Sequence, residues 1–157
     1  MCLLHLGLDE GDDCRVVIRD AYDYAIKASE GGEDGKYDAI FVDVFDDSNV
    51  VPEVFTSCNF AVAVKSMLGV GGVAAINLHT GNDLEDELFR DCVKSWEGAF
   101  GFEGCQVGGV RFQNNKVLVG ARDGKFNWRR DDAKVEAEGM GWGFDPSKYC
   151  KPRRRPI

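Results

Sequence analysis

Apolar residues occur along this chain in short runs that alternate with amphipathic stretches, and this pattern predicts strands separated by helices. The central run, YDAIFVDVF at 37–45, is rich in β-branched and aromatic residues. It is too short to span a membrane, and its composition is typical of a strand buried on both faces. Similar runs at 15–19 (RVVIR) and 73–79 (VAAINLH) predict two further strands.

Three amphipathic stretches follow these runs and predict helices. At 21–29 the apolar residues fall three and four positions apart, as on one face of a helix. A second helix is expected to begin near Thr56, as its N-cap, and to end at Gly69. Asn82 is followed three residues later by Glu85, a spacing that resembles a capping box and predicts the start of a third helix.

The last part of the chain predicts a hairpin and a tail. The segments at 105–112 (CQVGGVRF) and 116–122 (KVLVGAR) are two strands joined by a short polar turn. A short helix is expected at about 130–138, followed by an extended, basic tail at 141–157. We therefore predict one α/β domain over 1–140. It has a mostly parallel sheet of about five strands, helices on both faces and an antiparallel edge strand.

Composition limits the classes of function. The chain has 157 residues, the size of one domain, and its net charge of −8 argues against general nucleic-acid binding. Its six cysteines form no C-x-x-C pair and match no zinc-site spacing, so we expect a reducing, cytoplasmic environment. No apolar stretch reaches the roughly 20 residues of a spanning helix, and no membrane partner is expected. We interpret the basic tail as a solvated terminus, with contact to an acidic partner as the alternative.

Two acids follow predicted strands and are the best candidates for chemistry. Asp20 comes after the run at 15–19, and Asp43 comes after the apolar core of the central run. A carboxylate is too costly to bury alone, so each is expected at a carboxyl end, where an open α/β sheet meets its ligand crevice. The alternative for Asp20 is a cap on the helix that follows it. His5 and His79 lie far apart with no third ligand, so no metal site is predicted.

At this point the sequence resembles a known family. The segment at 38–81, DAIFVDVFDDSNVVPEVFTSCNFAVAVKSMLGVGGVAAINLHTG, is similar to the core of the spermidine synthase-like family of the S-adenosylmethionine-dependent methyltransferase fold. The matching features are the two acids after strands, the loop with one proline before a T-x-x-x-F helix, and the strand ending Asn77-Leu78-His79. The resemblance covers about 3–122 and implies a Rossmann-like sheet of the class I methyltransferase type.

The resemblance also implies a function and a set of site residues. It implies a transferase that uses S-adenosylmethionine or its decarboxylated form as cosubstrate, with an amine or another small molecule as acceptor. Asp20 and Ala21 would lie beside the adenine, and Asp43 would orient the acceptor and act in its deprotonation. Phe45 would narrow the acceptor pocket, and Asp46 would match a later acid of the same site. A carboxylate suits this task, because a protonated amine is no nucleophile until its proton is removed.

Two departures from the family pattern narrow these expectations. Polyamine synthases usually carry a D-S-S-D-P-like run where this chain has 43–47 (DVFDD). The small hydroxyl residues and the proline of that run are missing here, which argues against polyamine specificity. The family's glycine-rich turn and the next strand with its ribose-binding acid are absent from the sequence. We therefore expect a carboxyl-terminal portion of the fold that binds the cosubstrate weakly. The alternative is a non-catalytic α/β interaction module, with a homodimer through an exposed sheet edge.

Overall fold

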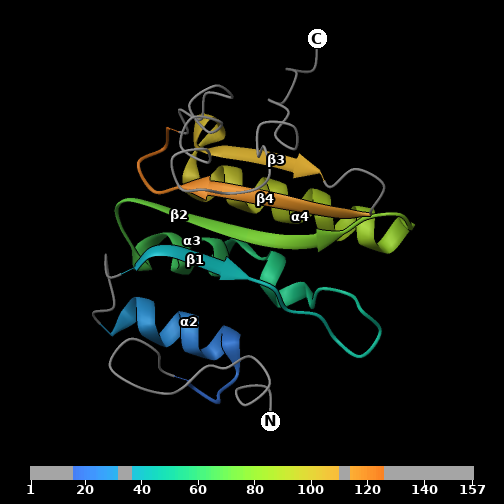
Figure 1. Cartoon of the computed structure of the whole chain (residues 1–157), viewed down its shortest axis with the longest axis horizontal. Coiled ribbons are helices and arrows are strands. Elements are labelled where there is room, and N and C mark those ends of the chain that lie inside the picture. The colour runs from blue at the N-terminus through green and yellow to red at the C-terminus, as the bar shows by residue number, and fades with distance from the viewer. Residues whose placement is uncertain (1–15, 32–36, 110–113, 126–157) are drawn as a thin grey trace, which may run out of the picture.

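The computed structural model describes residues 16–31, 37–109 and 114–125 (Figure 1). The predicted helix at 130–138, the tail at 141–157 and His5 lie outside these residues. Within them the α-helices are α2 (Ala21–Glu30), α3 (Cys58–Met67) and α4 (Asp83–Phe100), and two short 3-10 turns are η1 (Glu53–Thr56) and η2 (Phe102–Gly104). The strands are β1 (Tyr37–Val42), β2 (Leu68–His79), β3 (Cys105–Gly109) and β4 (Asn115–Ala121).

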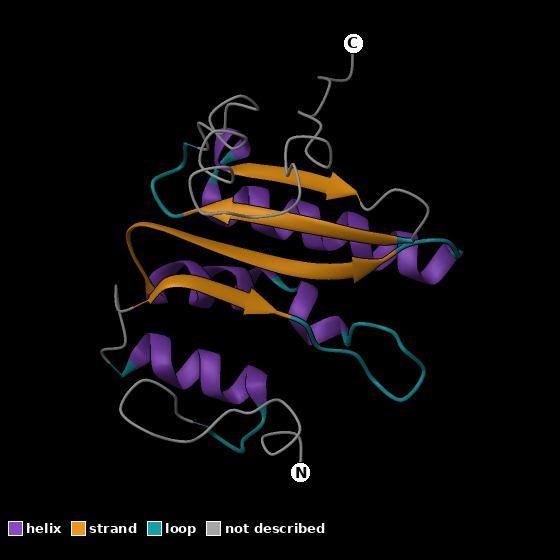
Figure 2. Cartoon of the chain, in the orientation of Figure 1, coloured by secondary structure: helices purple, strands orange, loops and turns teal. Residues whose placement is uncertain are grey.

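The described strands form one mixed sheet in the order β1-β2-β4-β3 (Figure 2). β1 and β2 are parallel, whereas β2 with β4 and β3 with β4 are antiparallel. The prediction of an α/β fold with an antiparallel hairpin is confirmed. In the described residues, however, the sheet has four strands rather than about five, and one of its three pairings is parallel.

The missing strand is the run expected at 15–19. Residues 16–20 of the described chain belong to no strand, and Ile18 is 95% exposed. β-branched residues favour a strand only when a pleated surface is there to pack against. Among the described strands β1 pairs with β2 alone, and residues 16–20 add no strand to its other edge.

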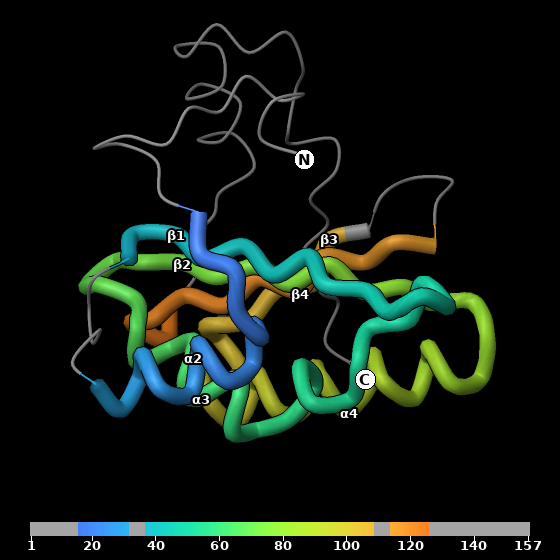
Figure 3. The backbone as a smooth tube through the Cα atoms, turned by 90° about the horizontal axis from the view of Figure 1, so that it is seen from below, coloured from blue at the N-terminus to red at the C-terminus, as the bar shows by residue number. Residues whose placement is uncertain are grey.

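All three described α-helices cover the same face of the sheet, as the view along the layers shows (Figure 3). α2 packs on α3, and α4 lies against β2, β4 and β3. Alternate residues of the central strand, Ala74, Ile76 and Leu78, point into this layer and are at most 1% exposed. Trp96 and Phe100 of α4 stack beneath the strands with ring centroids 5.1 Å apart.

The expectation that 37–45 is buried on both faces is wrong in the described structure. Val42 faces the helical layer and is 8% exposed, whereas Phe41 points the other way and is 80% exposed. An apolar run on a strand does not specify how many faces are covered, because that depends on which elements pack above and below the sheet. Helices on both faces are likewise not seen among the described residues.

Local hydrogen bonds correct the limits of the second helix and confirm the start of the third. Ser57 caps α3 by accepting from the backbone N–H of Phe60 at 3.3 Å, whereas the Thr56 hydroxyl donates to the Glu53 carbonyl at 2.9 Å. α3 ends at Met67 and β2 begins at once at Leu68, so Gly69 is not the stop. Asn82 caps α4 as predicted, because its side chain accepts from the Glu85 N–H at 2.9 Å.

β2 is longer than expected, because it begins five residues before the apolar run at 73–79. Gly71 sits inside it with a φ of 78°, a conformation that suits glycine. Of the helices within the described residues, none combines the length and the apolar character needed to cross a membrane.

Candidate functional site

Asp43 lies at the carboxyl end of the parallel pair, where β1 has just ended. The register pairs Val42 with Ile76, so Asp43 comes next to Asn77 on β2. The Asn77 side chain donates from Nδ2 to Asp43 Oδ1 at 3.0 Å. Asp43 is exposed to solvent. The carboxylate is therefore held from one side and accessible to a ligand from the other.

A second amide extends this contact across the sheet. Asn115, the first residue of β4, donates from Nδ2 to Asn77 Oδ1 at 3.4 Å. β4 lies on the far side of β2 from β1. β2 and β4 thus contribute one asparagine each, and both amide nitrogens donate in the direction of Asp43, which follows β1.

The loop after Asp43 is built around Asp46. Its Oδ1 accepts from the backbone N–H groups of Ser48 and Val50, both at 2.9 Å. Its own N–H donates to the Val50 carbonyl, and its carbonyl accepts from the N–H of Asn49, again both at 2.9 Å. Asn49 has a φ of 62°, which asparagine tolerates better than most residues. These bonds show Asp46 shaping its own loop, a role that the sequence did not reveal.

His79 connects this loop to the end of β2. Its ring lies against Phe45, with centroids 4.6 Å apart and planes tilted by 36°. Its Nδ1 is 3.2 Å from Nδ2 of Asn49, which lies in the same loop. Phe45 is therefore half-buried against the His79 ring, and it lies two residues after Asp43 in the sequence.

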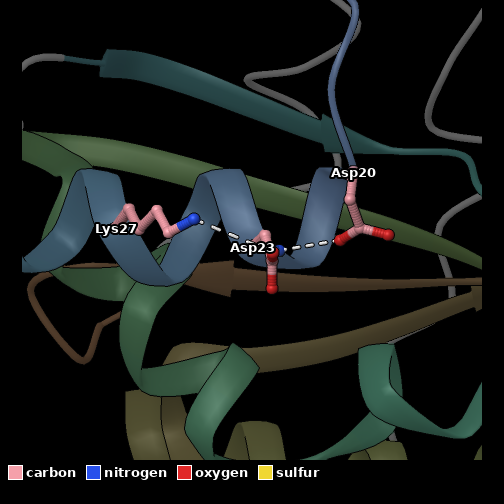
Figure 4. A network of polar contacts seen from close by, with 3 residues as sticks. All are labelled: Asp20, Asp23 and Lys27. Atoms are coloured by element: carbon pink, nitrogen blue, oxygen red, sulfur yellow. Dashed lines mark hydrogen bonds and ion pairs between the residues drawn. The ribbon is translucent and has the colours of Figure 1, made fainter.

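α2 begins at Ala21, with Asp20 as its N-cap, and its first turn lies at the end of the sheet where β1 ends (Figure 1). Asp20 Oδ1 accepts from the Asp23 N–H at 2.8 Å, which is the capping interaction left open by the sequence (Figure 4). Asp23 also lies 3.8 Å from Lys27, an exposed pair that adds little stability. The cap does not use the whole carboxylate of Asp20, which is exposed.

A groove of about 760 Å³ runs along β1 and is also lined by residues of α2, α3 and the segment before α2. Ala21 lines it, and so does Val42, the residue immediately before Asp43. Asp20 lines a neighbouring hollow of about 440 Å³, which shares Arg19 and Tyr24 with the groove. The remaining residues around the groove are Val17, Ala25, Tyr37, Ala39, Ile40, Phe41, Phe60, Val64 and Met67.

Neither a metal-binding cluster nor a reactive buried thiol is found among the described residues. They contain no group of three or more His, Cys, Asp or Glu side chains placed to hold a metal ion. Burial raises the pKa of Cys92 from 9.0 to about 12, with Cys105 nearby adding to the effect, so this thiol stays protonated.

The residues that sequence reasoning missed are Asn77, Asn115 and Asn49. The signal for Asn77 was available, because it is a polar residue within the otherwise apolar run VAAINL. Asn49 and Asn115 gave no such signal, since each stands in a polar stretch typical of loops and turns.

Three solved structures are similar to this chain. Human methyltransferase-like protein 13 in complex with SAH matches with a TM-score of 0.68 and 24% identity, over 96% of this chain and 66% of that one. A probable spermidine synthase from Corynebacterium glutamicum matches with a TM-score of 0.64 and 19% identity, over 96% and 57%. Spermidine synthase from Thermotoga maritima matches with a TM-score of 0.56 and 14% identity, over 82% and 42%.

These likenesses show the fold. The chain shares the α/β architecture of a methyltransferase-like protein and of spermidine synthases, and it spans 66% or less of the length of each. No family model and no curated protein matches the sequence.

Proposed function

We propose that this chain is the acceptor-side portion of a spermidine synthase-like transferase. It would act with S-adenosylmethionine or its decarboxylated form on an amine or another small acceptor. The observation that carries the proposal is Asp43, an exposed carboxylate held by Asn77 where parallel strands end. The shared fold supports it, since one structural neighbour was crystallised with SAH and two are named as spermidine synthases.

Asp43 supplies the base that the acceptor needs. A primary alkylamine, with a pKa of about 10.4 like that of lysine, is protonated at neutral pH and has no lone pair to donate. Its ammonium group would hydrogen-bond to the Asp43 carboxylate, which orients it and accepts one proton. The freed lone pair forms the new N–C bond as the C–S bond breaks, and those electrons return to sulfur to give a neutral thioether. Alignment is what this displacement chiefly requires.

The cosubstrate supplies the activated sulfonium carbon, and the groove beside β1 has the size and character to hold its adenosyl part. Ligand pockets are commonly about 300–1,000 Å³ and mostly apolar. The groove, at about 760 Å³, is within this range, and its walls combine apolar side chains such as Ala21 with polar ones such as Arg19. Asp20, at the rim of the neighbouring hollow, is an acceptor for the adenine amine. Binding through these residues would bring the reacting carbon toward the end of β1, which Asp43 follows.

Phe45 and Asp46 complete the acceptor side in this proposal. Phe45, supported by the His79 ring, narrows the space beside Asp43 and favours a slender acceptor. Asp46 holds the loop in its turn and adds negative charge, which attracts a cationic amine.

Isothermal titration of the purified chain tests the proposal. S-adenosylmethionine, decarboxylated S-adenosylmethionine and methylthioadenosine are titrated separately, with and without putrescine. We expect saturable binding of at least one, weakened at least tenfold by Ala21→Phe, which fills the groove. Val62→Phe, on exposed α3 surface away from this groove, is the matched control. Binding that is absent or only millimolar for all three compounds would reject the enzyme reading.

Labelled transfer to putrescine tests the role of Asp43. Asp43→Asn keeps the shape but removes the base, so transfer should fall about 100-fold or more. Asp38→Asn changes an exposed acid on β1 itself and should leave the rate unchanged. Equal effects of the two substitutions would show that Asp43 has no special part in the reaction.

A second candidate function, an interaction module that forms a homodimer, is favoured by exposed apolar side chains. Phe41 is 80% exposed and Val70 is 89% exposed, and β1 pairs on one side only among the described strands. Such an edge is a template for pairing with another strand. Sedimentation should then show a dimer that Phe41→Ser dissociates and that Val54→Ser, at an exposed site on η1, leaves intact. A monomer at every concentration would exclude this candidate.

A further inference from the structure

We infer that Asn77 is a positioning residue that fixes the Asp43 carboxylate for the acceptor, and that Asn115 fixes Asn77 in turn. This inference rests on the proposed function and deepens it. It concerns two side chains that belong to neither the cosubstrate groove nor the acceptor loop, and whose contacts come from neighbouring strands.

The hydrogen bonds have one consistent direction. An asparagine side chain has a donor end and an acceptor end, so its orientation is fixed when both ends are used. Asn77 turns its Nδ2 to the Asp43 carboxylate at 3.0 Å, which leaves its Oδ1 facing the opposite way. Asn115 Nδ2 donates to that oxygen at 3.4 Å. The reversed orientation of Asn77 would place its amide oxygen against the Asp43 carboxylate and its amide NH2 group against that of Asn115. The two neighbours therefore select one orientation.

The backbone beneath this row is firmly held. Asn77 lies inside β2, one residue past its last pair with β1, and is paired with Val117 on β4. Asp43, by contrast, lies one residue past the end of β1 and is exposed. An exposed carboxylate at a strand end samples several rotamers unless another group restrains it. The restraint comes from Asn77, which links the carboxylate to the rigid backbone of β2.

The consequence concerns the second carboxylate oxygen. With Oδ1 held by Asn77, rotation of the carboxylate is restrained, so Oδ2 needs less movement at the moment of reaction. Preorganised groups of this kind accelerate a step by placing atoms before the chemistry begins. Asn77 touches neither acceptor nor cosubstrate in this scheme, so its effect passes through Asp43.

Two substitutions of Asn77 separate positioning from packing. Asn77→Leu keeps a similar volume and removes the hydrogen bonds, whereas Asn77→Asp keeps the shape and places a second negative charge beside Asp43. We expect Asn77→Leu to lower kcat about fivefold to tenfold, the worth of one hydrogen bond, with the KM for the cosubstrate nearly unchanged. Asn77→Asp should lower kcat further. A residue needed for packing alone would tolerate the isosteric Asp, and that result would overturn the inference.

A double-mutant cycle and a remote control sharpen the test. In the Asp43→Asn background, Asn77→Leu should change kcat by less than about twofold, because its effect passes through the missing carboxylate. Asn59→Leu makes the same chemical change on the exposed surface of α3 and should leave kcat unchanged. Full additivity of Asn77→Leu and Asp43→Asn would overturn the inference.

A measurement that needs no activity keeps this inference distinct from the proposed function. The side-chain amide protons of Asn77 are followed by nuclear magnetic resonance in the full chain, in Asp43→Ala and in Asn115→Leu. Each substitution should shift these signals, and Asn59→Leu should not. Shifted signals in a chain without transferase activity would reject the function and keep the contact. If the Asn77 amide signals kept their chemical shifts in Asp43→Ala, the positioning role would be rejected even in an active enzyme.

Discussion

The substitution Gly120→Ala should destabilise the fold through one added methyl group. A Cβ built on Gly120 of β4 would lie 2.8 Å from Cγ of Phe100 and 2.9 Å from both of its Cδ atoms. These distances are below any normal carbon–carbon contact, and the methyl would meet the face of the ring. Phe100 has little room to withdraw, because it is 1% exposed and stacks on Trp96 with centroids 5.1 Å apart.

The magnitude follows from two opposing effects. Overpacking a well-filled core typically costs about 1–3 kcal/mol, through displaced side chains and backbone. Replacing glycine by alanine stabilises by about 0.4–1 kcal/mol, because the unfolded chain loses freedom. The net expectation is a loss of about 1–2 kcal/mol in the free energy of unfolding. At about 2–4 °C per kcal/mol for a chain of this size, the Tm should fall by about 2–8 °C.

Urea unfolding followed by circular dichroism measures this loss, with Gly108→Ala as the matched control. Gly108 lies in β3 of the same hairpin, and a Cβ there would make only an ordinary contact, 3.8 Å from the Val117 carbonyl oxygen. Its substitution should raise stability by about 0.4–1 kcal/mol, because the methyl fits without strain and the unfolded chain loses freedom. Phe100→Leu should remove much of the clash, so the double variant with Gly120→Ala should lose less than the sum of the two. Equal stabilities of Gly120→Ala and Gly108→Ala would refute the reasoning.

Three further predictions concern the helices and a buried thiol. Gly98→Ala in α4 should stabilise by about 0.5–1 kcal/mol in thermal unfolding, because nothing lies within 4 Å of the added methyl and alanine favours a helix; a lower Tm would contradict this. Ser57→Ala should cost about 1 kcal/mol in urea unfolding by removing the cap of α3, and an unchanged midpoint would count against the cap. Because burial raises the pKa of Cys92 from 9.0 to about 12, iodoacetamide at pH 8 should modify the exposed Cys58 and spare Cys92 until the chain is unfolded. The folded chain holds the Cys92 thiol proton more tightly than the unfolded chain, so the stability that this thiol contributes is complete below about pH 9 and declines as pH rises toward 12. Mass spectrometry checks the modification pattern, and urea titrations across this pH range check the decline in stability.

Local sequence was sufficient where neighbouring residues decide the structure. Asn82 and Glu85 predicted the start of α4 because a cap is made within one turn of the chain. The end of β1 was foreseen from Asp43, since a charge is rarely buried inside an apolar strand. The predicted cap of α3, Thr56, is one residue before the actual cap, Ser57. The two hydroxyl residues are adjacent, and the hydroxyl of Thr56 is used within the preceding 3-10 turn.

Tertiary packing decided what the sequence left open. The run at 15–19 has the composition of a strand, yet its described part lies outside the sheet because strand formation needs a partner edge and a covered face. The apolar pattern of 37–45 likewise did not show that Phe41 is exposed while Val42 is buried.

The candidate site divides in the same way. The sequence determined that an acid, Asp43, follows a strand and that a polar residue, Asn77, interrupts an apolar one. Only the fold decided that these two residues, 34 positions apart, share a hydrogen bond, and that Asn115, 38 positions beyond Asn77, continues it. The reason is that side-chain partners across a sheet are set by strand order and register. Those depend on how the whole apolar layer packs, and no single segment of the chain encodes them.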